Sequence, residues 1–434
     1  MSVARVNLWG RTIGAVSWNA EQNVAFFEYT PEFAASGIQV APVTMPLSSQ
    51  IYAFPALARA TFHGLPGLLA DSLPDRFGNA LINAWLAREG RSPESFNPVE
   101  RLCYTGARGM GALEYEPTIG PFHGESKPVD IAALVELAGE ILSRRTGLRA
   151  SFDVEAREAA LTDILRVGTS AGGARAKAII AWNEATNEVR SGQVRAGDGF
   201  GYWLLKFDGV SGNKDKELED PQGYGLIEYA YALMARDAGI EMMECRVLEE
   251  NGRSHFMTKR FDRTEKGGKL HMLTLGAMAH YDYNLAGAYS YEQAFDVMRQ
   301  LELPMASIEQ QFIRMALNIV ARNQDDHVKN IAFLMDRSGK WSLSPAYDVT
   351  YAWNPSGTWT AVQQMSLAGK RDGFTAADFV ECGKRIALKR GRALELLTGV
   401  QDVVKAWPEY AARAGVPAET AARIGRAHRM TPAS

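Results

Sequence analysis

The feature that most constrains this chain is a run of acidic and amide residues in its carboxyl-terminal half. Asp325 and Asn330 are five positions apart, and Asp348 follows after an apolar run, a turn and a second apolar run. The first separation is that of the Asp and Asn in a protein-kinase catalytic loop. Phosphoryl transfer needs a carboxylate that orients the attacking hydroxyl, and oxygen ligands that hold Mg2+ against the phosphates of ATP. The spacing therefore favours Asp325 as the catalytic base, with Asn330 and Asp348 as magnesium ligands.

The two apolar runs between these residues predict a β-hairpin. Ile331–Met335 and Trp341–Leu343 are joined by Asp-Arg-Ser-Gly-Lys, and Asp, Ser and Gly suit a tight turn. We expect the hairpin to bring Asn330 and Asp348 to the same end. Their oxygen atoms can then converge on one metal ion.

The same polar run allows other interpretations. An Asp-Asp-His sequence alone also fits a solvated loop or a helix end. Asp326 adjoins Asp325 and is an alternative base, although the spacing to Asn330 favours Asp325. His327 and Lys329 lie between Asp325 and Asn330, and both are further candidate nucleotide contacts.

A glycine-rich stretch lies upstream at residues 167–177 and reads Val-Gly-Thr-Ser-Ala-Gly-Gly-Ala-Arg-Ala-Lys. Glycines let a backbone approach phosphate closely and turn its N–H groups inward. Ser170 stands at the tip of this stretch. The pattern matches neither of the two standard glycine-rich nucleotide motifs, so a plain turn is the alternative. An apolar run suited to a strand follows at residues 178–182.

A lysine interrupts the next apolar strand pattern, Tyr-Trp-Leu-Leu-Lys-Phe, at position 206. Such a lysine either extends to water or holds ATP phosphates. The order of glycine-rich loop, strand, and strand with embedded lysine is that of a kinase amino-terminal lobe, which favours the second function for Lys206. Glu228, near the start of a helix predicted over residues 225–238, is the candidate ion-pair partner. Glu217 and Glu219 in the preceding loop are the alternatives.

The dipeptide Asn-Gly at residues 251–252 is a strong hairpin signal and predicts paired strands on both sides. In a two-lobed kinase the second strand runs into the hinge, whose backbone groups bind adenine. This places Lys259, Arg260 and Phe261 in the hinge. An exposed basic strand end is the alternative.

Composition excludes several classes of protein. The chain has 434 residues, a net charge of −3 and no block of basic residues, so net charge does not support general nucleic-acid binding. The three cysteines are far apart and suit a reducing compartment. We found neither a long apolar span nor a start like a signal peptide, so a cytoplasmic location without a membrane partner is expected.

These patterns predict an α+β, two-lobed protein-kinase-like fold with a small β-rich amino-terminal subdomain and a helical carboxyl-terminal lobe. The expected parts are the subdomain at 1–117, a linker at 118–128, the amino-terminal lobe at 129–262 and the carboxyl-terminal lobe at 263–434. Within the subdomain, Asp71, Asp75 and Arg76 are interpreted as a fixed turn with a local ion pair before a helix.

Taken together, these stretches resemble the HipA family of serine/threonine protein kinases, the toxin component of a bacterial toxin–antitoxin pair. The resemblance covers nearly the whole chain. The run D-D-H-x-K-N with a later P-A-Y-D is quite specific to that family. The segments L-L-A-D-S-L-P-D-R-F-G, S-x-G-G-A-R-x-K and K-R-F-D-R are supporting matches.

The resemblance implies a role for each matching residue. Asp325 would be the catalytic base, Asn330 and Asp348 the Mg2+ ligands, and Lys206 the phosphate-binding lysine. Lys259 to Phe261 would form the hinge. The loop that covers the phosphates would consist of Ala171, Gly172, Gly173, Ala174, Arg175, Ala176 and Lys177.

The resemblance also implies self-inhibition through Ser170, which matches the serine that family members autophosphorylate. Phosphorylation adds nearly two negative charges to a loop that must hold nucleotide phosphates, so repulsion should eject the loop. One departure is that Arg175 and Ala176 occupy places where other members can carry uncharged polar and acidic residues.

The partners implied by the resemblance are a protein substrate and a small helix-turn-helix antitoxin, HipB-like, that binds operator DNA as a dimer. No helix-turn-helix is evident in this sequence, so operator DNA would be contacted mainly through the antitoxin. Family members phosphorylate aminoacyl-tRNA synthetases and other translation-related proteins. Two other functions fit the same motifs, namely a co-repressor subunit of an antitoxin–operator complex and a small-molecule kinase. A two-metal hydrolase is disfavoured because clustered His and Asp ligands are too few.

Overall fold

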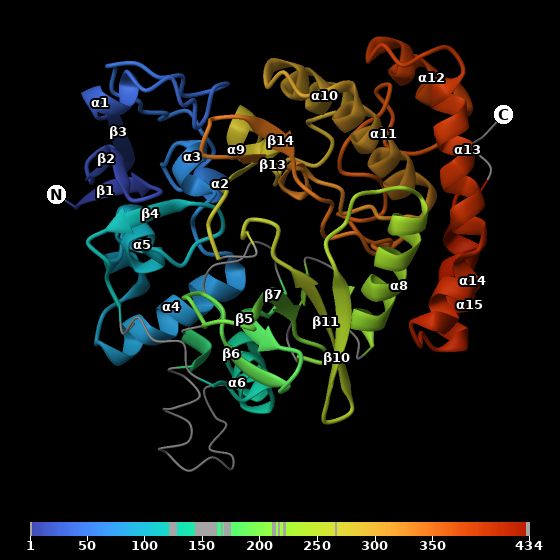
Figure 1. Ribbon diagram of the computed structural model, residues 1–434, viewed down its shortest axis with the longest axis horizontal. Helices are drawn as coiled ribbons and strands as arrows, with labels where there is room; N and C mark the ends of the chain where they lie inside the picture. The colour runs from blue at the N-terminus through green and yellow to red at the C-terminus, as the bar shows by residue number, and fades with distance from the viewer. Residues whose placement is uncertain are drawn as a thin grey trace.

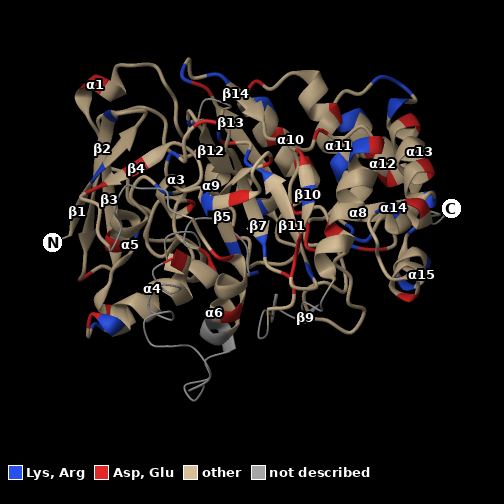
Figure 2. Cartoon of the chain, turned by 60° about the horizontal axis from the view of Figure 1, so that its bottom comes forward, with Lys and Arg blue, Asp and Glu red and all other residues tan. Residues whose placement is uncertain are grey.

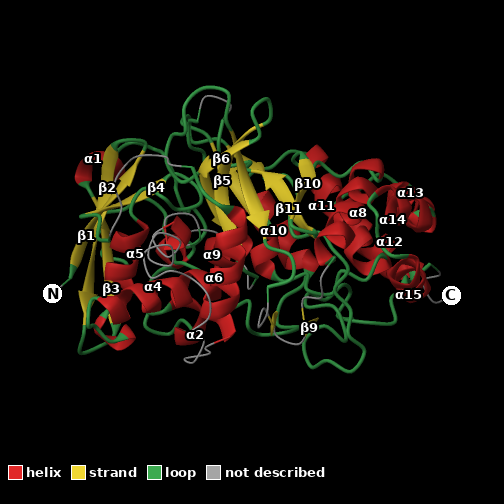
Figure 3. Cartoon of the chain, turned by 90° about the horizontal axis from the view of Figure 1, so that it is seen from below, coloured by secondary structure: helices red, strands yellow, loops and turns green. Residues whose placement is uncertain are grey.

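The computed structural model describes residues 2–120, 128–143, 163–165, 168, 175–210, 214–215, 218–219, 223–264 and 267–430. Antiparallel sheets lie at the amino-terminal end and in the middle, each accompanied by helices, whereas helices dominate the carboxyl-terminal end (Figures 1 and 3). The α+β fold class expected from the sequence is confirmed. Within the described residues, no helix is both long and apolar enough to cross a membrane.

The amino-terminal region is built on an antiparallel sheet in the order β3-β2-β1-β4. The strands alternate buried and exposed side chains, and Trp9 and Gly10 turn the chain between the first two with φ angles of 50° and 81°. Positive φ at both positions matches the right-handed twist of the paired strands. The strand bounds are β1 Val3–Leu8, β2 Arg11–Asn19, β3 Val24–Tyr29 and β4 Leu113–Glu116.

Short helices pack around this sheet. The longest, α4, begins at Arg76 because the Asp75 side chain accepts a hydrogen bond from the Gly78 backbone N–H, 2.7 Å away, and caps the helix. The helices are α1 Pro31–Ala34, α2 Arg59–Phe62, α3 Gly67–Ala70, α4 Arg76–Arg88, η1 Pro93–Ser95 and α5 Pro98–Thr105.

A second antiparallel sheet, in the order β10-β11-β7-β5-β6, occupies the middle of the molecule. Helix α8, Tyr224–Asp237, packs on β11 and β10, and helix α6 spans Ile131–Ser143. The strands are β5 Lys177–Asn183, β6 Glu188–Ser191, β7 Gly201–Lys206, β10 Cys245–Glu250 and β11 Arg253–Lys259. A small separate pair joins β8 Lys214–Asp215 to β9 Leu218–Glu219.

The carboxyl-terminal region combines helices with a sheet in the order β12-β13-β14. The predicted hairpin is present as β13 Ala332–Met335 and β14 Trp341–Leu343, and β12 His271–Thr274 adds to its other edge. The helices are α9 Leu275–Ala279, α10 Tyr291–Gln300, α11 Met305–Val320, η2 Val328–Asn330, α12 Ala376–Arg385, α13 Arg392–Lys405, α14 Trp407–Arg413 and α15 Ala418–Ala427.

Two apolar clusters join these regions to one another. The larger cluster connects side chains of the amino-terminal sheet, such as Phe27, to carboxyl-terminal ones, such as Phe333. The other connects Leu81 of α4 to Leu134 of α6 and Leu205 of β7. The amino-terminal region therefore packs on both of the other regions. Acidic and basic residues are interspersed along the chain, in agreement with the small net charge (Figure 2).

Candidate active site

Lys206, at the end of β7, lies between two carboxylates. Its Nζ is 2.5 Å from Oε1 of Glu228 on α8 and 2.6 Å from Oδ1 of Asp348. The lysine is held there because β7 is a central strand and α8 packs on the neighbouring β11. Burial alone would lower the pKa of Lys206, but Asp348 and Glu228 outweigh it and raise the pKa. The lysine is therefore a fixed positive charge.

Asp348 has an unusual backbone conformation and a carboxyl group whose pKa is lowered. Its φ of 52° lies in the left-handed region, which Asp adopts more readily than most residues. Burial opposes ionisation, yet the charges of Lys206 and Lys177 lower the pKa of Asp348. Its side chain is 31% exposed, so an ionised carboxylate remains accessible beside Lys206.

The end of the glycine-rich stretch supplies two more cations to this region. Arg175 stacks on the Tyr224 ring, with its guanidinium carbon 3.5 Å from the ring centroid, and lies 3.9 Å from Oε2 of Glu228. Lys177 is buried, and its Nζ is 3.1 Å from Oδ2 of Asp75. Asp75 thus caps α4 and pairs with Lys177, a partner far along the chain, so the interpretation as a local ion pair with Arg76 does not describe its main contact.

Asp325 and Asn330 lie on one loop that follows α11. The Asn330 side-chain amide donates to the Asp325 backbone carbonyl at 2.8 Å, which leaves the Asn330 Oδ1 to act as an oxygen ligand. The Asp325 carboxylate accepts a hydrogen bond from Trp359 Nε1 at 2.6 Å and has His327 Nε2 at 4.0 Å. Its side chain is 23% exposed, so an acceptor hydroxyl can reach it.

Asp326 faces the protein interior. Its carboxylate accepts hydrogen bonds from the Tyr291 hydroxyl at 2.5 Å and from the Gln364 backbone N–H at 2.7 Å. Burial raises its pKa. A general base must come within hydrogen-bonding distance of the proton that it accepts. Geometry therefore distinguishes the two neighbouring aspartates, because Asp325 is accessible and Asp326 is not.

The two halves of the site are joined by contacts across the hairpin. The Tyr347 hydroxyl donates to the Lys329 carbonyl at 2.5 Å, and the Asn323 amide donates to the Asp348 carbonyl at 3.3 Å. The loop that carries Asp325 and the loop that carries Asp348 are thus held side by side, as the hairpin pattern predicts.

The predicted hinge residues have more internal contacts than expected. The N–H groups of Lys259 and Arg260 already donate to the Glu244 and Tyr202 carbonyls. The Arg260 side chain is fully buried against Asp262, so it is not an exposed nucleotide contact. Phe261 packs near Tyr347, with ring centroids 5.5 Å apart. An adenine ring at this segment would therefore have to use other backbone groups.

Asp262 ties the hinge segment to the amino-terminal region. Its carboxylate pairs with Arg260 at 2.8 Å and Arg263 at 2.6 Å, and accepts from the Gly111 backbone N–H at 2.7 Å. Arg263 also donates to the Gly109 and Gly111 carbonyls at 3.1 Å. The supporting motif Lys-Arg-Phe-Asp-Arg is therefore largely a structural connection between regions.

Other predicted contacts fall in different places. Ala176 is fully buried in the apolar cluster around β5, so its side chain does not face a ligand. Lys329 lies over the Tyr283 ring, with Nζ 4.9 Å from the centroid. Five predicted residues lie outside the described residues, as does the alternative Glu217. They are Ser170, Ala171, Gly172, Gly173 and Ala174.

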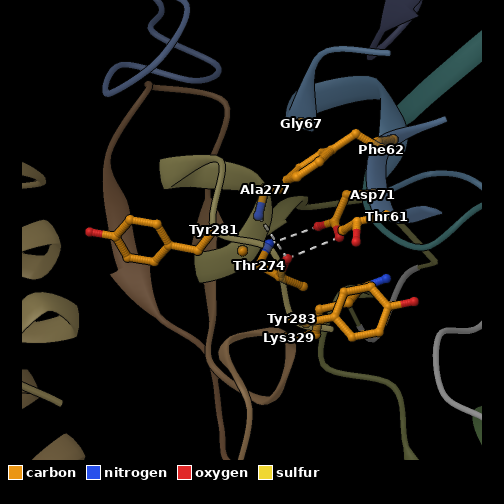
Figure 4. A pocket seen from close by; sticks show the side chains of 11 residues that line it. Thr61, Phe62, Gly67, Asp71, Thr274, Ala277, Tyr281, Tyr283 and Lys329 are labelled. Carbon is orange, nitrogen blue, oxygen red and sulfur yellow. Dashed lines mark hydrogen bonds between the residues drawn. The ribbon is translucent and has the colours of Figure 1, made fainter. Parts of the chain in front are cut away.

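A pocket with about 250 Å³ of empty space lies between the amino-terminal region and the catalytic loop (Figure 4). Its lining comes from α2, α3, α9 and the segment after α9, and Lys329 closes one side. Asp71 contributes to the wall but is occupied, because it accepts hydrogen bonds from the Thr274 backbone N–H and hydroxyl at 2.8 and 2.9 Å. Neither Lys206 nor Asp348 lines this pocket.

The sequence analysis did not identify Trp359 as a contact of Asp325. The local signal was a tryptophan within a polar segment, Asn-Pro-Ser-Gly-Thr-Trp-Thr. A tryptophan in such a segment is not expected to serve the core, which favours a role at a site.

The described residues form a mixed α+β fold with a helical carboxyl-terminal region. Family models match in two places, namely the HipA N-terminal domain at residues 4–116 and the HipA-like C-terminal domain at residues 169–407. The chain therefore belongs to the HipA family.

A solved structure from a toxin–antitoxin complex shares the fold. A chain from the Shewanella oneidensis MR-1 toxin–antitoxin system HipA, HipB and its operator DNA complex matches with a TM-score of 0.65 and 16% sequence identity, over 98% of this chain and 94% of that one. The Helicobacter pylori proinflammatory kinase CtkA matches with a TM-score of 0.29 and 10% identity, over 53% and 88%. A comparison with curated proteins gave no match.

Proposed function

We propose that this chain is an ATP- and Mg2+-dependent serine/threonine protein kinase that acts as the toxin of a toxin–antitoxin pair. The observation that carries the proposal is the ion-pair arrangement of Lys206 with Glu228 and Asp348, next to the loop with Asp325 and Asn330. A lysine–glutamate ion pair, a metal-binding aspartate and a catalytic-loop Asp and Asn are the parts that protein kinases require.

The residues fit a magnesium–nucleotide complex. Asp348 offers an ionised carboxylate and Asn330 an amide oxygen, and hard cations such as Mg2+ prefer oxygen ligands of these kinds. When bound, Mg2+ neutralises charge that develops on the transferred phosphoryl group. Lys206 would hold the nucleotide phosphates, and Arg175 adds positive charge on the same side.

In this mechanism Asp325 would orient the acceptor hydroxyl and accept its proton. Its exposed carboxylate is held by Trp359, and its backbone carbonyl is held by Asn330. Catalysis in this reaction class consists mainly of positioning and electrostatic stabilisation, so fixed charges matter more than covalent chemistry.

The finer proposal concerns targets and control. We infer a translation-related protein substrate, such as an aminoacyl-tRNA synthetase, and inhibition both by autophosphorylation at Ser170 and by a HipB-like helix-turn-helix antitoxin. Support comes from family membership. Because the proposed substrates belong to translation, we infer that the kinase acts in the cytoplasm.

The first experiment measures the intact mass of the purified chain before and after incubation with ATP and Mg2+. We expect the wild-type chain to gain one phosphate at Ser170, and Asp325→Asn to gain it at least about 100-fold more slowly. Asp402→Asn, at an exposed position of α13, is the matched control and should behave as wild type. Equal phosphorylation of Asp325→Asn would contradict the mechanism, and failure to bind ATP would contradict the nucleotide site.

A second candidate function is a co-repressor subunit of an antitoxin–operator complex. The observation that favours it is the fold match to a chain solved in a HipA, HipB and operator DNA complex. Operator affinity of the antitoxin that is unchanged on adding this chain would count against it.

A further inference from the structure

The indole of Trp359 contacts the carboxylate assigned above as the catalytic base. Trp359 Nε1 donates a hydrogen bond to Oδ1 of Asp325 at 2.6 Å, although the two residues are 34 positions apart. The Trp359 side chain is partly exposed, so the contact lies at the surface of the site and not in an apolar core.

We propose that Trp359 is a positioning residue whose indole N–H fixes the orientation of the Asp325 carboxylate toward the acceptor hydroxyl. This inference rests on the proposed kinase function. Asn330 holds the Asp325 backbone carbonyl, and His327 Nε2 is 4.0 Å from the carboxylate. The short indole contact thus acts directly on carboxylate orientation.

The segment that carries Trp359 is anchored to the catalytic loop through the neighbouring aspartate. The Gln364 backbone N–H donates to Asp326 at 2.7 Å, and the Gln364 side-chain amide donates to the Trp359 carbonyl. The Gln324 amide donates to the Ala361 carbonyl at 3.2 Å. The two adjacent aspartates therefore have different contacts. Asp326 accepts a hydrogen bond that anchors the segment carrying Trp359, and Asp325 accepts one from the Trp359 indole.

The chemical consequence follows from the charge of the acceptor. A hydrogen bond donated to an ionised carboxylate is stronger than one between neutral groups, and it favours the ionised form. A general base must be ionised and correctly oriented before it can accept a proton. Loss of the indole N–H should therefore loosen the orientation of the Asp325 carboxylate.

The kinetic test compares wild type with Trp359→Phe, which keeps an aromatic ring but removes the donor. We expect the rate of phosphate gain at saturating ATP and Mg2+ to fall about tenfold. The ATP concentration for half-maximal rate should stay unchanged, so that the variant lowers kcat without raising the KM for ATP. A merely structural role would change kcat and KM together.

Trp353→Phe is the matched control. Trp353 lies in the same segment, but its ring packs under Arg322, 4.4 Å from the guanidinium carbon. We expect this variant to keep the wild-type kcat and KM for ATP. A Trp359→Phe protein with the wild-type kcat, or an equal loss of kcat in both variants, would overturn the inference.

A second measurement does not depend on activity. In a chain labelled with 15N-tryptophan, which contains nine tryptophans, Trp359→Phe identifies one indole N–H resonance. That resonance should move on Asp325→Asn substitution, more than any other indole resonance. If the resonance moves but no phosphate is transferred, the proposed kinase function and the positioning role are both contradicted, although the hydrogen bond between Trp359 and Asp325 is confirmed. If it does not move, the inference fails while the kinase function can still stand.

Discussion

At the residue scale, the central feature of the site is one ammonium group shared by two carboxylates. Lys206 contacts Glu228 and Asp348 at nearly equal distances of 2.5 and 2.6 Å. Glu228 is buried, whereas Asp348 is partly exposed and is the proposed metal ligand. Glu228 therefore shares the Lys206 ammonium with Asp348, so that Asp348 is not its sole counter-charge.

The Glu228→Gln variant tests whether Glu228 and Asp348 share the Lys206 ammonium. Without the Glu228 charge, Lys206 should pair with Asp348 alone and compete with Mg2+ for it. A hydrogen bond to a charged group contributes about 1.5–3 kcal/mol, so we expect the rate to fall roughly 10- to 100-fold and the Mg2+ concentration for half-maximal rate to rise. Phosphate transfer measured over a magnesium titration checks this.

Glu249→Gln is the control for that titration, because Glu249 is exposed on the outer strand β10. It should leave the magnesium dependence unchanged. A Glu228→Gln protein that needed no more Mg2+ than wild type would show that Glu228 does not govern the Lys206–Asp348 contact.

At the scale of the element, the segment after β11 is fixed by a buried ion-pair cluster. Asp262 is fully buried with Arg260, and Arg263 is nearly so. Burial alone would raise the pKa of Asp262, but the two guanidinium groups outweigh it and hold the pKa well below its usual range. The folded state therefore requires the ionised carboxylate.

Asp262→Asn should destabilise the protein by about 3–5 kcal/mol, because it leaves buried arginines without a counter-charge. A group whose pKa is lowered on folding stabilises above its unfolded-state pKa, and this contribution is lost as the pH falls. The stability difference between wild type and variant should therefore be full near neutral pH and shrink in acid. Denaturant unfolding at several pH values measures it.

The control is Asp198→Asn, since Asp198 is fully exposed. It should change stability little at any pH. A difference between Asp262→Asn and wild type that grew as the pH fell would contradict the assignment of the Asp262 pKa.

Elements with strong local patterns could be predicted from the sequence, and those defined by distant partners could not. The hairpin of β13 and β14 follows from two apolar runs and a turn, and its prediction is confirmed. Strand β6 has no strong local pattern, because its residues are mostly half-buried and it is a strand through its pairing with β5. The contacts of Asp75 with Lys177 and of Trp359 with Asp325 join residues 102 and 34 positions apart, so no local pattern reveals them.

At the scale of the whole molecule, the amino-terminal region contacts the carboxyl-terminal region through closely packed backbones. A Cβ atom at Gly67 on α3 would meet the Ala277 carbonyl oxygen of α9 at 2.3 Å, too close for any side chain. The Gly67 backbone N–H also donates to His280 Nε2 at 3.0 Å. Glycine at position 67 therefore sets the distance between the two regions.

Gly67→Ala should separate α3 from α9 and lower stability by about 1–3 kcal/mol, in the range of overpacked cores. Gly399→Ala is the matched control, because Gly399 lies within α13 with no atoms within 4 Å of an added Cβ. That change should be neutral or stabilise by up to about 1 kcal/mol. Thermal unfolding of both variants tests the contrast, and equal melting temperatures would contradict it.

The attachment of Asp262 to Gly111 has a mechanical consequence for the whole molecule. The strand that leads from one lobe to the other is clamped from outside by the amino-terminal region through Asp262, Arg260 and Arg263. Any opening or closing of the lobes would change the backbone next to residues 260–263. These residues are held by hydrogen bonds to the amino-terminal region. A protein that bound residues 109–111 would therefore alter the angle between the lobes without contacting the nucleotide site.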